Sequence, residues 1–440
     1  MNRNVILITI DCLRADHLGC YGYGRETSPF LDQLAANGVT FQNAFANGPF
    51  TAAAFLSILA SAYPLDFEHQ TPLPKKAVLI SETLKAKGIA TAAIHSNPYL
   101  SAFYGYNRGW DYFEDFMYPT IGKRGNTLGR VVPERVKGLY QFLKLCLFGV
   151  KPFENAAAIN TCAINWLNQN KDSSFFAWLH YMDIHEPYLV YSTGIRQKDS
   201  KNISRISQIK SLINSQKGKL TPEDLRNFVA IYDDKLRYID EQLKSLVNFL
   251  KNNELLDNTL LIITSDHGQE FLDHGGFGHV ARFYDELIHI PLILSGPEIA
   301  GHSDDSLVSQ IDICPTILHF YGIPSPIEYQ GCNLLENSDR EYIISEAAHN
   351  ERGVYLEGNK IYPSEFRTYA IRTERWKYIG KYRNSNSIGS ELYDLQNDPQ
   401  EKIDIASTRQ QVTREFAQIL DYRLSKRTVL RLKRKIRKRL

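Results

Sequence analysis

The sequence predicts an α/β protein with a central, mostly parallel β-sheet flanked by helices and a small C-terminal α+β subdomain. Residues 4–10 and 259–264 form continuous apolar runs rich in β-branched side chains, which is typical of parallel strands buried on both faces. The runs lead directly into Asp11 and, after one serine, into Asp266. Open α/β sheets bind ligands at the carboxyl ends of their strands, so we expect both carboxylates at one functional edge.

The remaining elements divide the chain into three predicted parts. A large domain covers 1–335, with an insertion at about 120–155, a polar excursion at 195–225 and a long helix from about 223 to 252. A small subdomain covers 336–425, where 369–373 and 376–379 are expected to be antiparallel strands. A basic amphipathic tail covers 426–440.

Composition indicates a folded globular protein. Of the 440 residues, 43% are hydrophobic and 23% are charged, and the formal net charge is +2, which argues against disorder across the chain. No apolar run is long enough to span a bilayer. The first strand begins almost at the initiator Met and the six cysteines are scattered. We therefore expect a cytoplasmic protein with reduced thiols.

Two segments suggest contact with lipid. The tail carries only basic charges, and Val429, Leu432, Ile436 and Leu440 recur at helical spacing, a pattern that suits an anionic membrane surface. A solvated tail is the alternative; specific nucleic-acid binding is not expected because no base-reading module accompanies it. Residues 138–150 are unusually apolar and predict either a helix packed on the core or a lipid-facing helix.

Several motifs resemble those of the sulfatase family within the alkaline phosphatase superfamily. The segment 47–59 resembles the sulfatase active-site segment, and the following segments resemble other family landmarks in the same order: 27–35, 176–188, 284–293, 312–318 and 392–401. The resemblance extends from residue 4 to about residue 400. It implies an alkaline-phosphatase-like central sheet and makes 1–335 a sulfatase-like catalytic domain.

The active-site segment departs from the sulfatase pattern. Thr51 stands at the position of the modified cysteine, Ala53 at the proline and Phe55 at the arginine, while Cys12 replaces the second metal aspartate. A threonine nucleophile instead resembles lipoteichoic acid synthases and phosphoethanolamine transferases. An alternative role for Thr51 is the N-cap of a helix.

The resemblance implies one divalent metal ion bound by Asp11, Thr51, Asp266 and His267. The metal would lower the pKa of the Thr51 hydroxyl and make it a nucleophile. A histidine ligand favours Mn or Zn, with Ca or Mg as further possibilities.

Other polar residues are expected around the same cleft. His185 and His279 are the predicted catalytic histidines, which would contact the substrate oxyanion or protonate the leaving group. His274 competes with His279 for this role. His95 and Asn97 are candidate substrate-binding residues, although a purely structural role for His95 is the alternative.

These features predict a metal-dependent hydrolase or transferase that forms a covalent Thr51 intermediate. The expected substrate is a phosphate-type ester, such as phosphoglycerol or phosphoethanolamine, on a glycan or lipid near a membrane. Formylglycine expels sulfate through its second hydroxyl, which threonine lacks, whereas phosphothreonine can be cleared by in-line attack. The alternatives are a sulfuric ester hydrolase without formylglycine and a catalytically silent anion-binding homologue.

Overall fold

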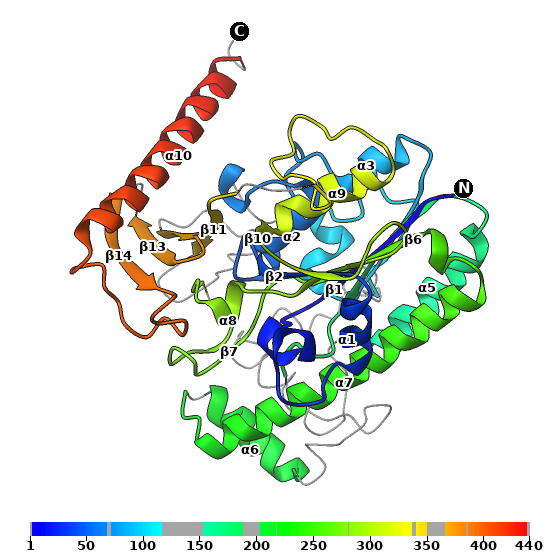
Figure 1. Ribbon diagram of the computed structural model, residues 1–440, viewed down its shortest axis with the longest axis horizontal. Helices are drawn as coiled ribbons and strands as arrows, with labels where there is room; N and C mark the ends of the chain where they lie inside the picture. Colours follow the sequence, from blue (N-terminus) through cyan, green and yellow to red (C-terminus); the bar gives the residue numbers. More distant parts are fainter. Residues whose placement is uncertain are drawn as a thin grey trace, which may run out of the picture. The chain divides into compact units, whose positions relative to one another are not determined.

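The computed structural model divides the chain into two compact units that are interleaved along the sequence. Unit 1 comprises Met1–Thr40, Ser81–Ser265 and Pro291–Ser303, and unit 2 comprises Phe41–Ile80, Asp266–Ile290 and Asp304–Leu440. Figure 1 colours the chain along the sequence. The residues that the structure describes are 2–67, 72–116, 153–187, 203–216, 218–279, 281–336, 340–349, 366–383 and 386–437.

An eight-stranded sheet has the strand order β10-β2-β9-β6-β1-β5-β3-β4. The five strands from β6 to β4 in this order run parallel to their neighbours, whereas β9 is antiparallel to both β6 and β2. The sheet is therefore mixed but mostly parallel, as predicted. Its strands are β1 (Asn4–Ile10), β2 (Val39–Phe45), β3 (Ala90–Ile94), β4 (Tyr112–Glu114), β5 (Phe175–Tyr181), β6 (Thr259–Ser265), β9 (Leu292–Ser295) and β10 (His302–Ser309).

The two predicted apolar strands are neighbours at the centre of this sheet. All seven residues of β1 and all seven of β6 are buried, because both faces of these strands are covered. Ile10 is the register partner of Ser265. The peptide bonds that follow this pair lead to Asp11 and Asp266, so the two carboxylates follow matched positions on adjacent strands.

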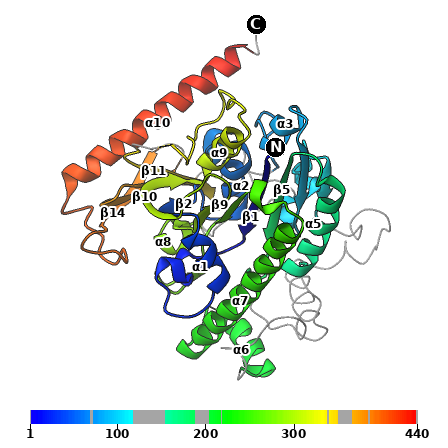
Figure 2. The same ribbon diagram turned by 45° about the vertical axis from the view of Figure 1, so that its right-hand side comes forward.

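Long helices accompany the strands of unit 1. Pro222 opens α7, and Thr221 and Asp224 form a capping box there, which satisfies backbone N–H groups at the helix start. In unit 1, α5 packs on both β5 and α7, and α5 and α7 lie side by side in Figure 2. The helices are α1 (Pro29–Ala36), α3 (Ile80–Lys85), α5 (Ala156–Asn170), α6 (Arg205–Gln216) and α7 (Pro222–Asn252).

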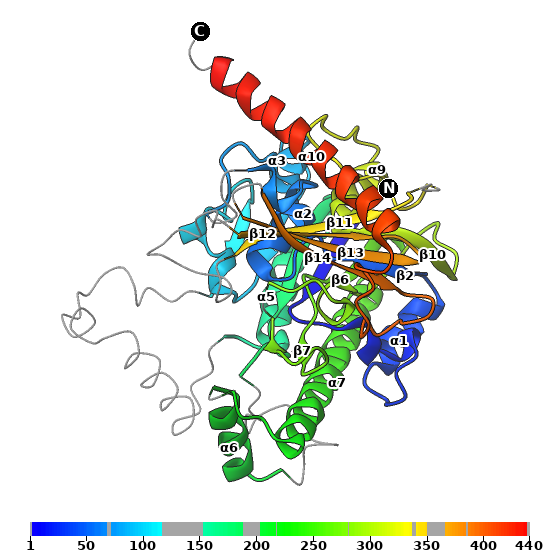
Figure 3. The ribbon, with the colours of Figure 1, turned by 90° about the vertical axis from the view of Figure 1, so that its left-hand side faces the viewer.

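Unit 2 contains an antiparallel four-stranded sheet in the order β11-β12-β13-β14. The helix α10 lies against this sheet (Figure 3). Phe416 and Leu420 of α10 share a buried cluster with Tyr378 and Tyr382 of the sheet. The predicted C-terminal strands are confirmed, because they correspond to β12 and β13 of this sheet.

The elements of unit 2 are α2 (Thr51–Ala60), β7 (Glu270–Phe271), β8 (Phe277–Gly278), α8 (Asp285–Ile288), α9 (Ile313–Phe320), β11 (Ile343–His349), β12 (Phe366–Arg372), β13 (Trp376–Arg383), β14 (Asn386–Asp394) and α10 (Gln410–Arg437).

Several predicted segments fall partly or wholly outside the described residues. The apolar stretch 138–150 and nearly all of the insertion lie there, whereas part of the polar excursion forms α6. The backbone of the basic tail is helical up to Arg437, but its side chains lie outside the description. Among the described residues, every helix is too short or too polar to cross a bilayer.

Candidate active site

Asp11 is the first polar group of the site in unit 1. It follows β1 directly and is fully buried. Its Oδ2 atom accepts hydrogen bonds from Asn97 Nδ2 at 2.9 Å and from His180 Nε2 at 3.2 Å. Asn97, predicted to bind substrate, is thus placed against the carboxylate. These two donors fix the orientation of Asp11, as the outer partners of metal-binding carboxylates do.

His180 is a site residue that the sequence reasoning did not single out. Its register partner on β1 is Thr9. The Thr9 hydroxyl donates to His180 Nδ1 at 2.8 Å and accepts from Trp178 Nε1 at 2.9 Å. Because the Asp11 carboxylate can only accept, His180 Nε2 carries the proton, and Nδ1 of the neutral ring accepts. A histidine within an otherwise apolar central strand was the signal that could have revealed this buried chain of hydrogen bonds.

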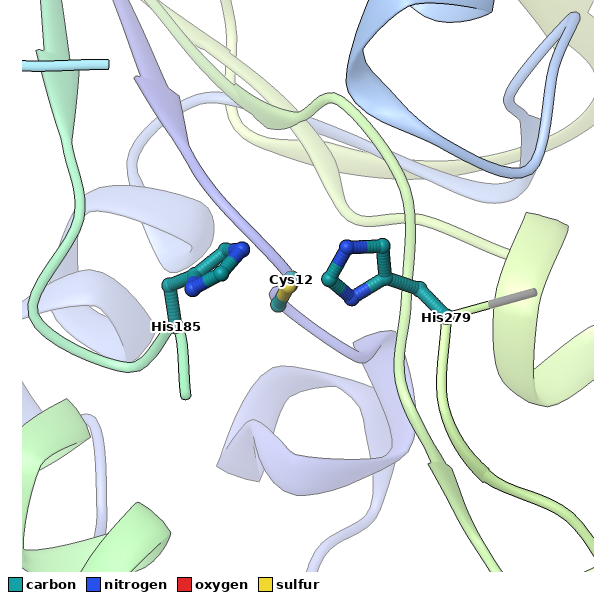
Figure 4. Close-up of side chains that lie close together, drawn as sticks. All are labelled: Cys12, His185 and His279. Atoms are coloured by element: carbon teal, nitrogen blue, oxygen red, sulfur yellow. The ribbon is translucent and has the colours of Figure 1, made fainter. Parts of the chain in front are cut away.

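Cys12 and His185 lie beside Asp11 in unit 1. The Cys12 thiol donates to Asp11 Oδ1 with an S···O distance of 3.0 Å, and Sγ lies within 4.8 Å of a ring nitrogen of His185. Figure 4 shows both side chains, and it also draws His279 of unit 2. His185 Nδ1 donates to the carbonyl oxygen of Glu186 at 2.6 Å. The lone pair of the neutral ring is therefore on Nε2, ready to accept a proton or bind a cation.

His95 is held in an aromatic environment. Its side chain is fully buried and its ring lies 5.3 Å from each of the Phe113 and Trp178 rings, measured between centroids. Burial, with a smaller contribution from His180, lowers the pKa of His95 to about 3. The ring is therefore neutral at physiological pH, and these contacts favour the structural role over substrate binding.

Unit 2 supplies Thr51, Asp266 and His267. Thr51 is the first residue of the fully buried helix α2, and Phe50, not Thr51, is the N-cap. The Thr51 hydroxyl donates to His267 Nε2 at 3.3 Å. His267 Nδ1 donates to the carbonyl oxygen of Gly268 at 2.9 Å, so Nε2 carries the lone pair. Asp266 Oδ2 lies 3.4 Å from the same nitrogen.

The two histidines near β7 and β8 have different surroundings. The His279 ring lies 4.7 Å from that of His267 between centroids, and its Nδ1 donates to Gln269 Oε1 at 3.3 Å. The two ring nitrogens of His274 lie 2.6 Å from Glu286 Oε1 and 3.0 Å from the carbonyl oxygen of Glu401. Because protein acceptors occupy both of its nitrogens, His274 is suited to holding its loop, and His279 is the stronger candidate for substrate contact.

Comparison with known proteins identifies the family. The sulfatase family model matches residues 3–323, and the model for the C-terminal part of N-sulphoglucosamine sulphohydrolase matches residues 273–428. The chain belongs to the sulfatase family. It is a sulfatase-family hydrolase with the alkaline-phosphatase-like fold, as its motifs predict.

Curated relatives of this sulfatase-family chain include arylsulfatase K from Canis lupus familiaris, which is 26% identical over 453 residues, covering 95% of this chain and 81% of the relative. Arylsulfatase K from Homo sapiens is also 26% identical, over 461 residues, with the same two coverages.

Solved structures share the fold. The phosphonate monoester hydrolase of Agrobacterium radiobacter has a TM-score of 0.72 at 21% identity and covers 97% of this chain and 96% of its own. A protein in complex with its substrate D-glucosamine-2-N,6-O-disulfate has a TM-score of 0.68 at 19% identity, with coverages of 97% and 98%.

Members of this sulfatase family depend on a metal, and each unit by itself contains groups suited to binding a divalent cation. Unit 1 offers the Asp11 carboxylate, which is oriented by two donors. Unit 2 offers Asp266 and the unprotonated Nε2 of His267. A histidine whose other ring nitrogen donates to a carbonyl is in the tautomer that metal sites use. The donor chemistry therefore fits a divalent cation.

Proposed function

We propose that this protein hydrolyses a sulfuric ester carried by a glycan, using a divalent metal held by Asp11, Asp266, His267 and Thr51. The observation that carries the proposal is the pairing of Thr51 Oγ1 with His267 Nε2 in unit 2. Because Thr51 is the first residue of the buried helix α2, its hydroxyl lies at the helix start. Backbone N–H groups and the helix dipole favour a tetrahedral anion there.

The choice of a sulfuric ester draws its support from the relatives. The curated relatives are named arylsulfatase K, and a protein of the same fold has been solved with a disulfated glucosamine substrate. This support favours the sulfuric ester over the phosphate-type ester that the Thr51 substitution suggested. A sulfated glycan is accordingly the proposed substrate class.

The proposal of one shared metal site rests on strand register within unit 1. Ile10 and Ser265 are paired on adjacent parallel strands, and the next residues along the chain are Asp11 and Asp266. Open α/β sheets bind ligands at the carboxyl ends of their strands, so we assign both carboxylates to one metal. Zn or Mn is the proposed ion, because an imidazole ligand suits these metals better than Ca.

The chain's own residues supply the nucleophile and the proton carrier for hydrolysis of the sulfuric ester. A bound divalent cation would lower the pKa of the Thr51 hydroxyl and polarise the sulfuryl oxygens. Thr51 Oγ1 bonds to sulfur as the bond from sulfur to the glycan oxygen breaks, and His185 or His279 takes up the Thr51 proton and passes it to that oxygen. Water then attacks the same sulfur as the bond from sulfur to Thr51 Oγ1 breaks. One proton of the water passes through the histidine to Thr51 Oγ1, which restores the hydroxyl, and hydrogen sulfate leaves.

Release of inorganic sulfate from an aryl sulfate and from a disulfated glucosamine tests this proposal. We expect Thr51→Ala to lower kcat by about 100-fold or more, since it removes the nucleophile. The matched control is Ser57→Ala, which removes another buried hydroxyl of α2; this hydroxyl donates a 2.9 Å hydrogen bond to the carbonyl oxygen of Ala62. Equal turnover by the parent and Thr51→Ala would refute the role of Thr51. No sulfate release from either substrate would favour the silent anion-binding homologue.

A second candidate function is hydrolysis or transfer of a phosphate-type ester, on a glycan or lipid, through Thr51. Thr51 itself favours this candidate, because threonine lacks the second hydroxyl with which formylglycine expels sulfate. A phosphothreonine intermediate can be cleared by in-line attack of water or an alcohol. A phosphoryl-type adduct on Thr51 after incubation with a phosphodiester, detected by peptide mass mapping, would support it.

We also propose that the basic tail binds an anionic membrane surface at the cytoplasmic face. The sequence from 426 to 440 contains nine basic residues and no acidic residue, and each cation near such a surface contributes about 1 kcal/mol. Sedimentation with phosphatidylserine-containing liposomes tests this proposal. Deletion of 426–440 should abolish co-sedimentation, and unchanged sedimentation would refute it.

A further inference from the structure

We propose that Cys12 is itself a ligand of the metal, as a thiolate beside Asp11, and that it makes the site selective for thiophilic ions such as Zn and Co. The inference rests on the proposed metal-dependent function and adds a ligand to it. Three features of unit 1 carry the inference: the backbone conformation of Cys12, the position of its sulfur, and the donor groups around that sulfur.

The backbone of Cys12 is in the left-handed region, with φ at +63°. For a residue with a Cβ this conformation is strained relative to glycine. Two contacts hold it: the Tyr232 hydroxyl donates to the carbonyl oxygen of Cys12 at 2.8 Å, and the next N–H, of Leu13, donates to Ser265 Oγ at 2.9 Å. Glycine would adopt the same backbone conformation without strain. We therefore infer that the Cys12 side chain has a function at this position.

The sulfur of Cys12 is turned into the polar site and away from solvent. The residue is fully buried, and Sγ lies 3.0 Å from Asp11 Oδ1. A thiol is a weak hydrogen-bond donor, so it offsets little of the cost of burying the Asp11 carboxylate. A cation between the two groups would bind both. The other carboxylate oxygen, Oδ2, is already oriented by Asn97 and His180.

The donors in unit 1 are chemically mixed. Cys12 Sγ lies within 4.8 Å of a His185 ring nitrogen as well as next to Asp11. Carboxylate, thiolate and imidazole together suit Zn or Co, whereas Ca and Mg require oxygen ligands. On binding, the sulfur–metal bond forms and the thiol proton is released to solvent. The substitution of cysteine at the second aspartate position would therefore change which metal the site selects.

Cobalt titration of the full-length, metal-free protein tests this inference without an activity assay. Visible ligand-field bands report that Co²⁺ is bound, and a near-ultraviolet sulfur-to-cobalt charge-transfer band reports a thiolate ligand. We expect the ligand-field bands and the charge-transfer band in the parent protein. Cys12→Gly should fold, since glycine relieves the left-handed strain, yet it should lose the charge-transfer band and bind Co²⁺ about 100-fold more weakly.

Two controls separate the possible outcomes. Cys20→Ser, in the same loop, should keep the charge-transfer band, because burial and Asp32 raise the pKa of the Cys20 thiol to about 12. Cys12→Asp should bind Mn²⁺ better relative to Zn²⁺ than the parent does. Bound Co²⁺ without the charge-transfer band in the parent, or a band that persists in Cys12→Gly, would overturn the thiolate ligand. Failure of the parent to bind Co²⁺ at all would instead contradict the metal-dependent function on which the inference rests.

Discussion

A buried cluster of charges in unit 2 gives a quantitative prediction. The Lys377 side chain is fully buried, and its Nζ lies 2.6 Å from Asp285 Oδ1 and 2.8 Å from Glu401 Oε1. Asp285 has a second cation, Arg372, at 3.7 Å. Two carboxylates thus share Lys377, and the one without the additional cation should be the easier to protonate. We therefore choose Glu401→Gln, which fixes that group in a neutral form.

The expected size of the effect follows from the pKa of Glu401. Burial raises this pKa, Lys377 lowers it and Asp285 raises it, so that it moves from 4.5 to about 7. Because the folded pKa lies above the unfolded one, the associated stability is fully present below about pH 4.5 and is lost as the pH rises through about 7. Between about pH 5 and pH 8 the loss is about 2–3 kcal/mol.

Urea unfolding at these two pH values measures the effect. Relative to the parent, Glu401→Gln should gain about 2–3 kcal/mol of unfolding free energy on going from about pH 5 to pH 8, because glutamine has no proton to lose. Glu391→Gln is the matched control. Burial raises the pKa of Glu391, but contacts led by Lys381 outweigh burial and hold it below its ordinary value. Its variant should show no such change.

An equal difference between Glu401→Gln and the parent at both pH values would refute the raised pKa of Glu401. Glu401 would then keep its charge in the folded protein across this range, and Lys377 would fully stabilise both carboxylates. A change of equal size in Glu391→Gln would show that the pH effect is general and not specific to the buried cluster.

Three further predictions concern the site and unit 2. Asn97→Ala removes the 2.9 Å hydrogen bond to Asp11, so it should weaken Zn²⁺ binding, measured by calorimetry, at least 10-fold. An unchanged Zn²⁺ affinity would show that Asn97 does not position the Asp11 carboxylate. Arg423→Ala removes the cation that lies 3.3 Å from the fully buried carboxylate of Glu346. We expect it to lower the free energy of unfolding, measured in urea, by about 3 kcal/mol. A decrease below about 1 kcal/mol would contradict a buried ion pair. Acid-quenched reactions with ³⁵S-labelled aryl sulfate should leave label on the peptide containing Thr51, and label elsewhere would refute Thr51 as the nucleophile.

The sequence was sufficient to predict the central strands because burial on both faces produces an uninterrupted apolar run. β1 has the predicted bounds, and β6 extends one residue beyond them, to Ser265. The positions of Asp11 and Asp266 at the ends of these strands followed from the same pattern. The C-terminal strands β12 and β13 were also predictable, because their flanking turns and β-branched or aromatic residues are local signals.

Features that depend on pairing between distant segments were not predictable in this way. His180 contacts Asp11 because β5 and β1 are paired with Thr9 opposite His180, and one sequence does not encode that register locally. The left-handed conformation of Cys12 is likewise imposed by Tyr232 and Ser265 from remote segments. His95 has the polarity of a site residue, but its aromatic surroundings arise only from tertiary packing.

The substrate class is tested most directly by comparing two substrates that share one leaving group. With a single preparation of the metal-loaded protein, kcat/KM is measured for an aryl sulfate and for the matching aryl phosphate diester, with Thr51→Ala as the background. A sulfuric ester hydrolase should turn over the sulfate more efficiently, and both activities should depend on Thr51. A higher kcat/KM for the phosphate diester would contradict the proposed sulfuric ester and would favour phosphate-type chemistry at Thr51.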